Sequence, residues 1–240
     1  MLRRTLANQR TFLLSLAAAV IVFILWNVSG LDFILYPFRL FVTYVHEAGH
    51  GSAAILTGGH LVSFQIFADG SGVANTIGGT RALVIPAGYL GAALFGAVVF
   101  YLTNRLRTPR SIAVVLGLLL MVFSVLFGLS SPTAFAVGMI FGAALIIIGW
   151  KFNRAITTVI LDVLAIITGL NAVLDVYYLI GNSQIGLGNI PNDAAAFQAE
   201  ITPVIPAALI ALIWVLIAVA LLGASVWFAI LRPMRRKHLI

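Results

Sequence analysis

The sequence predicts an all-α polytopic membrane protein with about seven transmembrane helices and a short β-hairpin at the membrane edge. Of its 240 residues, 62% are hydrophobic and only 9% are charged, whereas about a quarter of the residues of a soluble domain are charged. The apolar residues form runs of the roughly 20 residues that a helix needs to cross a bilayer. We therefore expect one integral membrane domain over residues 1–240.

Seven apolar segments are long enough to count as spans. The first follows a basic N-terminus, as in a signal peptide, but Trp26 and Asn27 stand where a small-residue cleavage site is expected, so we predict an uncleaved span. Only residues 130–133 separate the fourth and fifth segments, which predicts a tight helical hairpin. An odd number of crossings places the two ends of the chain on opposite sides of the membrane. The predicted spans are residues 11–29, 33–57, 82–103, 111–130, 134–150, 155–180 and 203–231.

Two connections are too polar to span a membrane. In residues 58–81, a stretch rich in β-branched and aromatic residues precedes the turn signal Asp-Gly-Ser-Gly at 69–72, and together they predict a β-hairpin over 61–76. Residues 181–202 are rich in glycine, asparagine and proline, which predicts a loop. We expect this loop to end in a short helix started by Asn192 or Asp193.

Ionisable residues gather in the pentapeptide HEAGH, residues 46–50, inside the second apolar segment. The chain has four histidines and two glutamates, and half of each is here, where polar groups are costly and mark function. His46 and His50 are one helical turn apart, so both imidazoles leave the same face and can bind one Zn²⁺. Glu47 can take a proton from a water activated by the metal. We interpret the motif as a zinc site rather than as an interhelical hydrogen-bond network.

A catalytic zinc site has three protein ligands, so the third must come from elsewhere in the chain. His50 is seven residues from the end of the second span, and Asp175 is five residues from the end of the sixth. Four crossings separate these spans, so they run in the same direction and both residues lie roughly 8–10 Å below the same face. Asp162 lies near the opposite face. We predict Asp175 as the third ligand, ahead of Asp193 in the following loop, because a carboxylate at that depth needs a partner such as a cation.

Asn171 precedes Asp175 by one helical turn and lies on the same helix face. It is placed to orient the carboxylate or to hydrogen-bond the backbone of a bound substrate. An interhelical polar contact of the kind common in membrane bundles is an equally good interpretation.

Cationic residues are divided unequally between the two faces. With seven spans, nine of them share the C-terminal face and four share the face that the HEAGH motif approaches. The positive-inside rule puts the nine-charge face in the cytoplasm and the zinc site toward the exterior, although the basic first span favours the reverse. Charges beside anionic headgroups need no nucleic-acid partner, and without cysteine no disulfide or thiolate ligand exists. The nine are Arg105, Arg107, Arg110, Lys151, Arg154, Arg232, Arg235, Arg236 and Lys237, and the four are Arg3, Arg4, Arg10 and Arg81.

At these residues the sequence resembles the site-2-protease family of intramembrane zinc metallopeptidases, specifically its compact bacterial B-type branch. The similar segments are HEAGHGSAAILTGGHLVSF, DGSGVANT, PAGYLGAALFGA, LNAVLDVYYL and NDAAAFQAEITPVIPAALIALIW. The resemblance implies a multi-pass protein of a bacterial cell membrane, with His46, His50 and Asp175 as zinc ligands and Glu47 as the catalytic acid/base. It also implies a site that opens toward the cytoplasm. The chain departs from the family where Val176 follows Asp175 in place of glycine, and no connection has room for a PDZ domain.

The leading hypothesis is an intramembrane zinc metalloprotease that acts in the lipid bilayer on membrane-spanning or membrane-associated proteins, with Glu47 activating the attacking water. A membrane-spanning substrate has to unwind first, and the free edge of the hairpin at 61–76 is suited to hold it as an added strand. The alternatives are a non-catalytic binding or assembly protein that keeps the fold, and a transporter with an intramembrane metal site. A pure binder has no need of Glu47, and a transporter of that kind has repeated halves, of which the sequence shows no sign.

Overall fold

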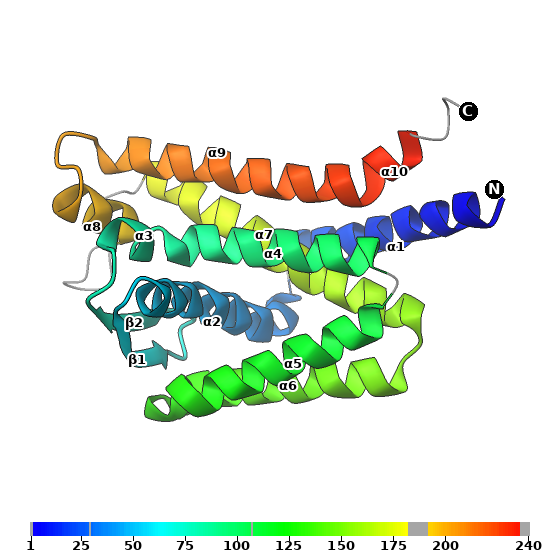
Figure 1. Cartoon of the computed structure of the whole chain (residues 1–240), viewed down its shortest axis with the longest axis horizontal. Helices are drawn as coiled ribbons and strands as arrows, with labels where there is room; N and C mark the ends of the chain where they lie inside the picture. Colours follow the sequence, from blue (N-terminus) through cyan, green and yellow to red (C-terminus); the bar gives the residue numbers. More distant parts are fainter. Residues whose placement is uncertain (1, 29, 107, 182–191, 236–240) are drawn as a thin grey trace.

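The computed structural model describes residues 2–28, 30–106, 108–181 and 192–235. Most of the chain forms helices that run along one axis, and a small two-stranded sheet lies at one end of them (Figure 1). Within the described residues, five helical segments are long and apolar enough to cross a membrane, so the protein is an integral membrane protein with several spans. They are formed by α4 (Ala87–Arg105), α5 (Pro109–Phe127) with a 3₁₀ turn (Gly128–Ser130), α6 (Pro132–Lys151), α7 (Arg154–Gly181), and α9 (Ala207–Val226), which continues through a π-helical turn (Trp227–Leu231) into α10 (Arg232–Arg235).

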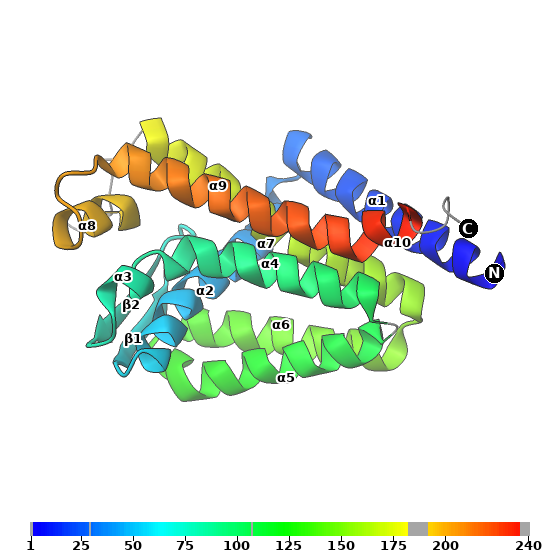
Figure 2. The same cartoon turned by 45° about the horizontal axis from the view of Figure 1, so that its top comes forward.

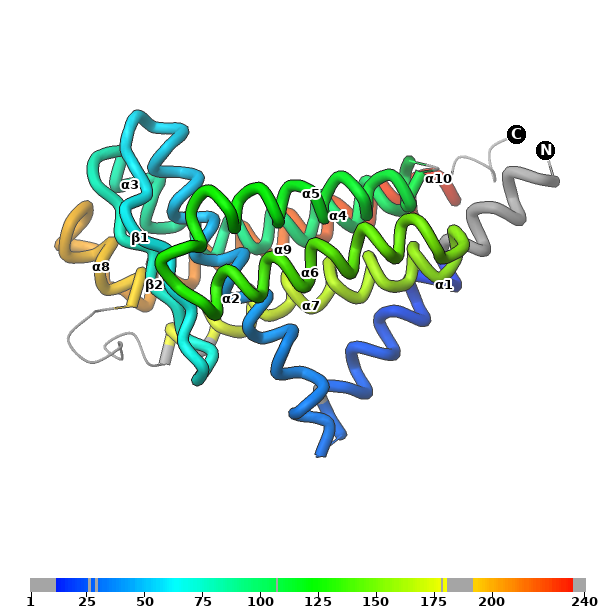
Figure 3. The backbone as a smooth tube through the Cα atoms, turned by 90° about the horizontal axis from the view of Figure 1, so that it is seen from below, coloured from blue at the N-terminus to red at the C-terminus, as the bar shows by residue number. Residues whose placement is uncertain are grey.

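The first two predicted spans differ from the other five. The described apolar part of α1 (Leu2–Asn27) is only Phe12–Leu25, and α2 (Asp32–Leu56) contains several ionisable residues. The turn between these helices lies beside the bundle, about midway along its long axis, and the helices run from it toward opposite ends (Figure 3). Together α1 and α2 therefore follow the length of the bundle once, and the count of seven spans is not confirmed.

Helix α1 begins, and α10 ends, at the same end of the bundle (Figure 1). This differs from the expectation of chain ends on opposite sides, because α1 and α2 make one passage instead of two. Nine of the eleven described Lys and Arg residues consequently lie in the elements that begin or end there. The nine are Arg3, Arg4, Arg10, Arg105, Arg110, Lys151, Arg154, Arg232 and Arg235, while Arg107, Arg236 and Lys237 lie outside the described residues.

Reporter fusions after residue 106 and at the C-terminus are expected to report the cytoplasm, because Lys and Arg near span ends are retained on that side. A fusion at the N-terminus should agree with them, since α1 starts at the same end. The helices α5, α6, α7 and α9 lie between residue 106 and the C-terminus. If the two fusions report opposite sides of the membrane, these helices do not make four crossings. Agreement on the exterior would instead place the HEAGH motif toward the cytoplasm, as the family resemblance implies.

The predicted hairpin is confirmed: β1 (His60–Ile66) pairs with β2 (Gly72–Ile77) in an antiparallel sheet. In its turn, the backbone N–H and the hydroxyl of Ser71 donate to Asp69 Oδ1 over 2.9 and 2.6 Å, which lowers the pKa of Asp69. Gly70 has a φ of 92°, a conformation that suits glycine. The predicted sequence therefore forms the turn through the side-chain hydrogen bonds of Asp69 and the backbone conformation of Gly70.

Packing fixes the hairpin on the helices beneath it. Phe64 of β1 is fully buried, and its ring lies 4.9 Å from the ring of Tyr44 on α2 and 5.6 Å from that of Phe123 on α5. The Thr43 hydroxyl on α2 also donates to the Gly70 carbonyl over 2.6 Å. The second strand is thereby held over the HEAGH segment of α2.

A short helix, α8 (Asp193–Glu200), lies at the same end of the molecule as the hairpin and α3 (Arg81–Val84) (Figure 2). It is the short helix expected after the loop, and Asn192 caps it by accepting a hydrogen bond from Ala195 N over 3.0 Å. Phe197 on α8 packs against Trp214 on α9, with ring centroids 5.6 Å apart. The rest of the predicted loop, residues 182–191, lies outside the described residues.

Asp162 of α7 is fully buried in a polar cluster with Ser15 of α1 and Asn104 of α4. Asn104 Nδ2 donates to Asp162 Oδ1 over 2.7 Å, and Ser15 Oγ lies 2.7 Å from Asp162 Oδ2 and 3.0 Å from Asn104 Oδ1. Ser15 Oγ is the donor toward Asp162 Oδ2, so Asp162 accepts from both of its neighbours. The cluster joins three helices through hydrogen bonds.

Asp162→Asn is expected to preserve stability, because an asparagine of the same size can accept from Asn104 and hydrogen-bond to Ser15. Asp162→Ala removes the acceptor of one Asn104 N–H and one partner of the buried Ser15 hydroxyl, and it is expected to destabilise by about 1–3 kcal/mol. Thermal unfolding of both variants in the same detergent measures the difference. Equal destabilisation by both substitutions would show that the charge of Asp162 is required.

Candidate metal centre

The HEAGH segment occupies the second half of α2, which places both imidazoles on one face. His50 Nδ1 lies 2.8 Å from the carbonyl oxygen of Val84, at the end of α3. Because a carbonyl only accepts, Nδ1 carries the hydrogen and the lone pair of Nε2 is left to bind a metal. His46 Nε2 lies 3.1 Å from His50 Nε2, so the two metal-binding atoms already face one point.

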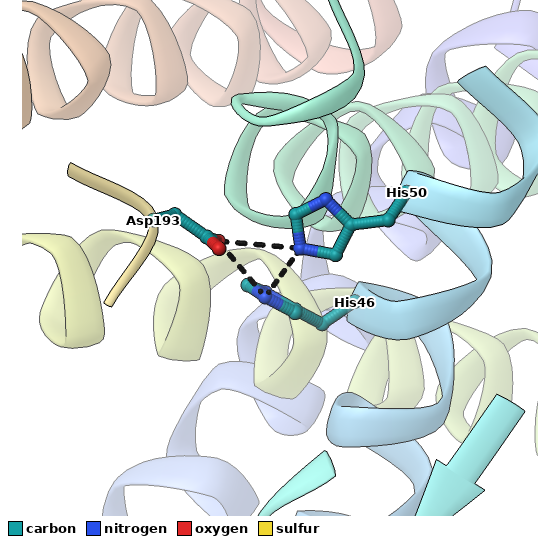
Figure 4. A group of neighbouring side chains, drawn as sticks. All are labelled: His46, His50 and Asp193. Atoms are coloured by element: carbon teal, nitrogen blue, oxygen red, sulfur yellow. Dashed lines mark hydrogen bonds and ion pairs between the residues drawn. The ribbon is translucent and has the colours of Figure 1, made fainter. Parts of the chain in front are cut away.

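Asp193 completes this group from the start of α8 (Figure 4). Its Oδ2 atom lies 3.2 Å from Nε2 of both His46 and His50. Ligand atoms around a tetrahedral Zn²⁺, with bonds of 2.0–2.1 Å, are about 3.3 Å apart, so the three distances fit one zinc ion. Asp193 Oδ2 is also buried without a hydrogen-bond donor among the described residues, and a bound cation would satisfy it.

Electrostatics favour the ionised form of this ligand. Burial opposes ionisation of Asp193, but without a metal the charged, protonated forms of His50 and His46 outweigh it and hold the pKa of Asp193 below its ordinary value; a bound cation would take the place of those protons. A carboxylate that stays ionised is the form that coordinates a metal.

Glycines allow α4 to approach the metal-binding face of α2. A Cβ atom at Gly88 would lie less than 3.0 Å from Nε2 of both His46 and His50. Gly49, within the motif, faces the backbone of Ala87 in the same way. The backbone of α4 therefore forms one wall of the centre, in direct contact with the imidazoles.

Glu47 lies beneath the second strand of the hairpin and is only 6% exposed. A Cβ atom at Gly72 would lie 2.7 Å from Glu47 Cγ and 2.9 Å from Glu47 Oε1. The first residue of β2 thus covers the carboxylate directly, and the hairpin shields Glu47 from bulk water.

A cavity of about 640 Å³ opens beside these residues. Its lining includes His46, Glu47, His50 and Asp193, together with residues 70–76 of the hairpin and parts of α4, α7 and α8. At the rim, Arg81 of α3 donates two hydrogen bonds, of 2.7 and 2.8 Å, to Glu200 of α8, and these bonds lower the pKa of Glu200. The ion pair links the two sides of the rim.

Asp175, the predicted third ligand, lines the same cavity. It is not among the three residues whose ligand atoms lie within 4.8 Å of one another, which are His46, His50 and Asp193. Asn171 Nδ2 donates a hydrogen bond to Asp175 Oδ2. This contact agrees with one interpretation offered for Asn171, that it orients the Asp175 carboxylate. The structure therefore brings Asp193 to the histidines and holds Asp175 beside them. Asp162 lies in its separate cluster, away from this cavity.

Two groups beside the metal ligands were not predicted from the sequence. The carbonyl of Val84 orients His50, but a backbone carbonyl carries no residue-type signal. Tyr89 lines the cavity, and its ring centroid lies 4.5 Å from that of His46. The available signal was its place in PAGYLGAALFGA, one of the segments of the family resemblance.

A multi-span bundle with a histidine pair, an adjacent glutamate and a partly buried aspartate around one cavity defines a candidate membrane metallopeptidase. The family model described as Peptidase M50B-like matches residues 15–225. The chain therefore belongs to this site-2-protease-type family of intramembrane metallopeptidases. No curated protein and no solved structure matches it.

Proposed function

We propose that the protein is an intramembrane zinc endopeptidase that hydrolyses peptide bonds of membrane-spanning or membrane-associated proteins. The observation that carries this proposal is the position of Glu47 in one cavity with three ligand atoms spaced for a single tetrahedral cation. Membership of a metallopeptidase family supports the same chemistry at a general level.

In the proposed hydrolysis, the residues of the site have different roles. His46, His50 and Asp193 would hold the ion, and a bound Zn²⁺ supplies Lewis-acid activation of the attacking water and the peptide carbonyl. Glu47 takes a proton from the attacking water and passes it to the leaving amine nitrogen. The C–O bond forms and the C–N bond breaks while the hairpin excludes bulk water from the carboxylate.

The hairpin offers a place for an unwound substrate. β2 pairs with β1 along one edge, and β2 residues also line the cavity beside Glu47. An extended segment added along the other edge of β2 would pass close to the proposed catalytic carboxylate, with its backbone held by strand hydrogen bonds. This geometry supports a substrate that is extended where it is cut.

Asp193→Ala is expected to lower bound zinc from about one equivalent per chain to well below half. Asp175→Ala should retain most of the metal, because of these two carboxylates it is Asp193 that lies 3.2 Å from both imidazoles. Metal analysis after gel filtration measures both variants, with Asp69→Ala in the exposed hairpin turn as the control. The reverse ranking would make Asp175 the ligand, as the depth argument from the sequence predicts.

Cleavage of a panel of single-span membrane proteins in liposomes tests the function itself. We expect the purified protein to cut at least one of them, to stop when 1,10-phenanthroline removes the metal, and to recover when Zn²⁺ is restored. The His46→Ala/His50→Ala double variant should neither bind zinc nor cut. A protein that binds zinc but cuts no member of the panel would contradict the proposal and favour a non-catalytic role.

A further inference from the structure

Tyr89 lies next to the proposed metal ligands but has no part in the chemistry described so far. Gly88, which precedes it, contacts both imidazoles, so the Tyr89 side chain leaves α4 at the metal centre. Its ring lies edge-on to that of His46, at 4.5 Å and 78°. The ring of Trp214 on α9 lies 6.3 Å from it. The tyrosine ring is therefore held between a metal ligand and the last long helix.

The hydroxyl of Tyr89 has no hydrogen-bond partner among the described residues, although the side chain lines the cavity and is partly buried. Three other polar side chains in the cavity wall are already engaged. Thr43 donates to a backbone carbonyl, Asn75 donates to Ser63, and Arg81 donates to Glu200. An unpartnered donor in such a site is available to a ligand.

Hydrolysis creates a need for such a donor. When water attacks a peptide carbonyl, the carbonyl oxygen takes on negative charge, and a preorganised donor aimed at it lowers the barrier. A tyrosine hydroxyl, with an ordinary pKa of about 10, is a neutral donor at pH 7. Glu47, His50 and Asp193 line the same cavity as Tyr89, and the Tyr89 ring packs on His46, so this residue lies among the groups that would surround the scissile bond.

We propose that Tyr89 is a further catalytic residue, whose hydroxyl donates a hydrogen bond to the carbonyl oxygen of the scissile peptide as negative charge develops there. The inference rests on the proposed endopeptidase function. Tyr89 keeps its proton throughout, while the proton of the attacking water passes through Glu47 to the leaving nitrogen. Its contribution is largest in the transition state, so it raises kcat more than it lowers KM.

Tyr89→Phe removes the hydroxyl and keeps the ring that packs on His46 and Trp214. With a fluorescein-labelled single-span membrane protein from the panel as the substrate, kcat is expected to fall by about 10²–10³-fold, while KM and the zinc content stay within about threefold. The control is Tyr101→Phe, the same change on α4 at a residue that does not line the cavity, and it should match the wild type.

Binding separates a catalytic role from a structural one. A phosphonamidate peptide mimics the tetrahedral, negatively charged oxygen, and Tyr89→Phe should weaken it by about 10²-fold. A planar peptide hydroxamate, which binds chiefly through the metal, should lose less than threefold. Equal phosphonamidate affinity in Tyr89→Phe and wild type, or loss of zinc from Tyr89→Phe, would overturn the proposal. If the wild type binds the phosphonamidate but cuts no member of the panel of single-span membrane proteins, the endopeptidase function fails, and the ratio of phosphonamidate affinities still decides the role of Tyr89.

Discussion

Glu47→Gln is expected to reduce cleavage by at least about 10³-fold while leaving the zinc content near one equivalent per chain. The substitution keeps the size of a side chain that packs directly against Gly72, so the hairpin should remain in place. It removes the carboxylate that is proposed to take the proton from the attacking water, and loss of a general base costs about 10²–10⁴-fold in rate. Glu47 is not one of the three residues gathered for the metal, so metal binding should survive.

Cleavage rates and metal analysis on the same preparation measure both parts of this prediction. The matched control is Glu200→Gln, at the only other glutamate of the chain, which is partly exposed at the cavity rim. An exposed ion pair contributes about 0–1 kcal/mol, so this variant should lose at most a few-fold in rate. Zinc-dependent cleavage at the wild-type rate by Glu47→Gln would remove Glu47 from the mechanism.

Gly88→Ala is expected to have a comparable effect on activity through a different cause, loss of the metal. The added methyl group would lie less than 3.0 Å from Nε2 of both His46 and His50, and the backbone that carries it belongs to a packed helix. The imidazoles must therefore move away from the geometry that suits zinc. Disturbing the groups that orient metal ligands typically costs about 10–100-fold in metal affinity, and displacing the ligands themselves should reach at least the upper end of that range.

Gly91→Ala provides the matched control for this prediction. It adds the same methyl group one turn further along α4, where the nearest atom, Gly49 Cα, lies 3.4 Å away. That is an ordinary contact distance, so zinc affinity should stay within a few-fold of the wild type. Zinc titrations with a competing chelator compare the variants. Full zinc binding by Gly88→Ala would show that the imidazoles do not lie against the backbone of α4.

Sequence patterns within single short segments were enough to predict several features of the site and of the fold. The four-residue spacing of HEAGH was enough to place two imidazoles and a glutamate on α2, and the turn residues at 69–72 were enough to predict the hairpin. Asn192 marked the start of α8, because a cap acts through neighbouring backbone N–H groups. The helical hairpin of α5 and α6 followed from a connection too short for any other arrangement.

Relations between distant segments were not predicted as well. The count of seven spans treated every apolar segment as a full crossing, whereas α1 and α2 together follow the length of the bundle once. The depth argument put Asp175 at the level of the histidines, and Asp175 lines the same cavity. That argument had no means of placing α8, which packs against α9 and brings Asp193 to the histidines. Hydrophobic periodicity reports which segments enter the membrane, but the packing between them decides which side chains meet.

The order of the metal-binding groups along the chain bears on biosynthesis. More than a hundred residues separate His50 from Asp193, and α8 depends on α9 for its position, because Gln198 Oε1 accepts from Ala207 N over 3.0 Å and Phe197 packs on Trp214. A chain emerging from the ribosome at about 5–20 residues per second therefore presents the histidine pair well before the aspartate. Under the proposed ligand assignment, the centre is complete only after α9 has entered the bilayer. Under the proposed function, the nascent chain would therefore lack its complete metal centre, and so be unable to cleave other proteins, while those proteins are being inserted beside it.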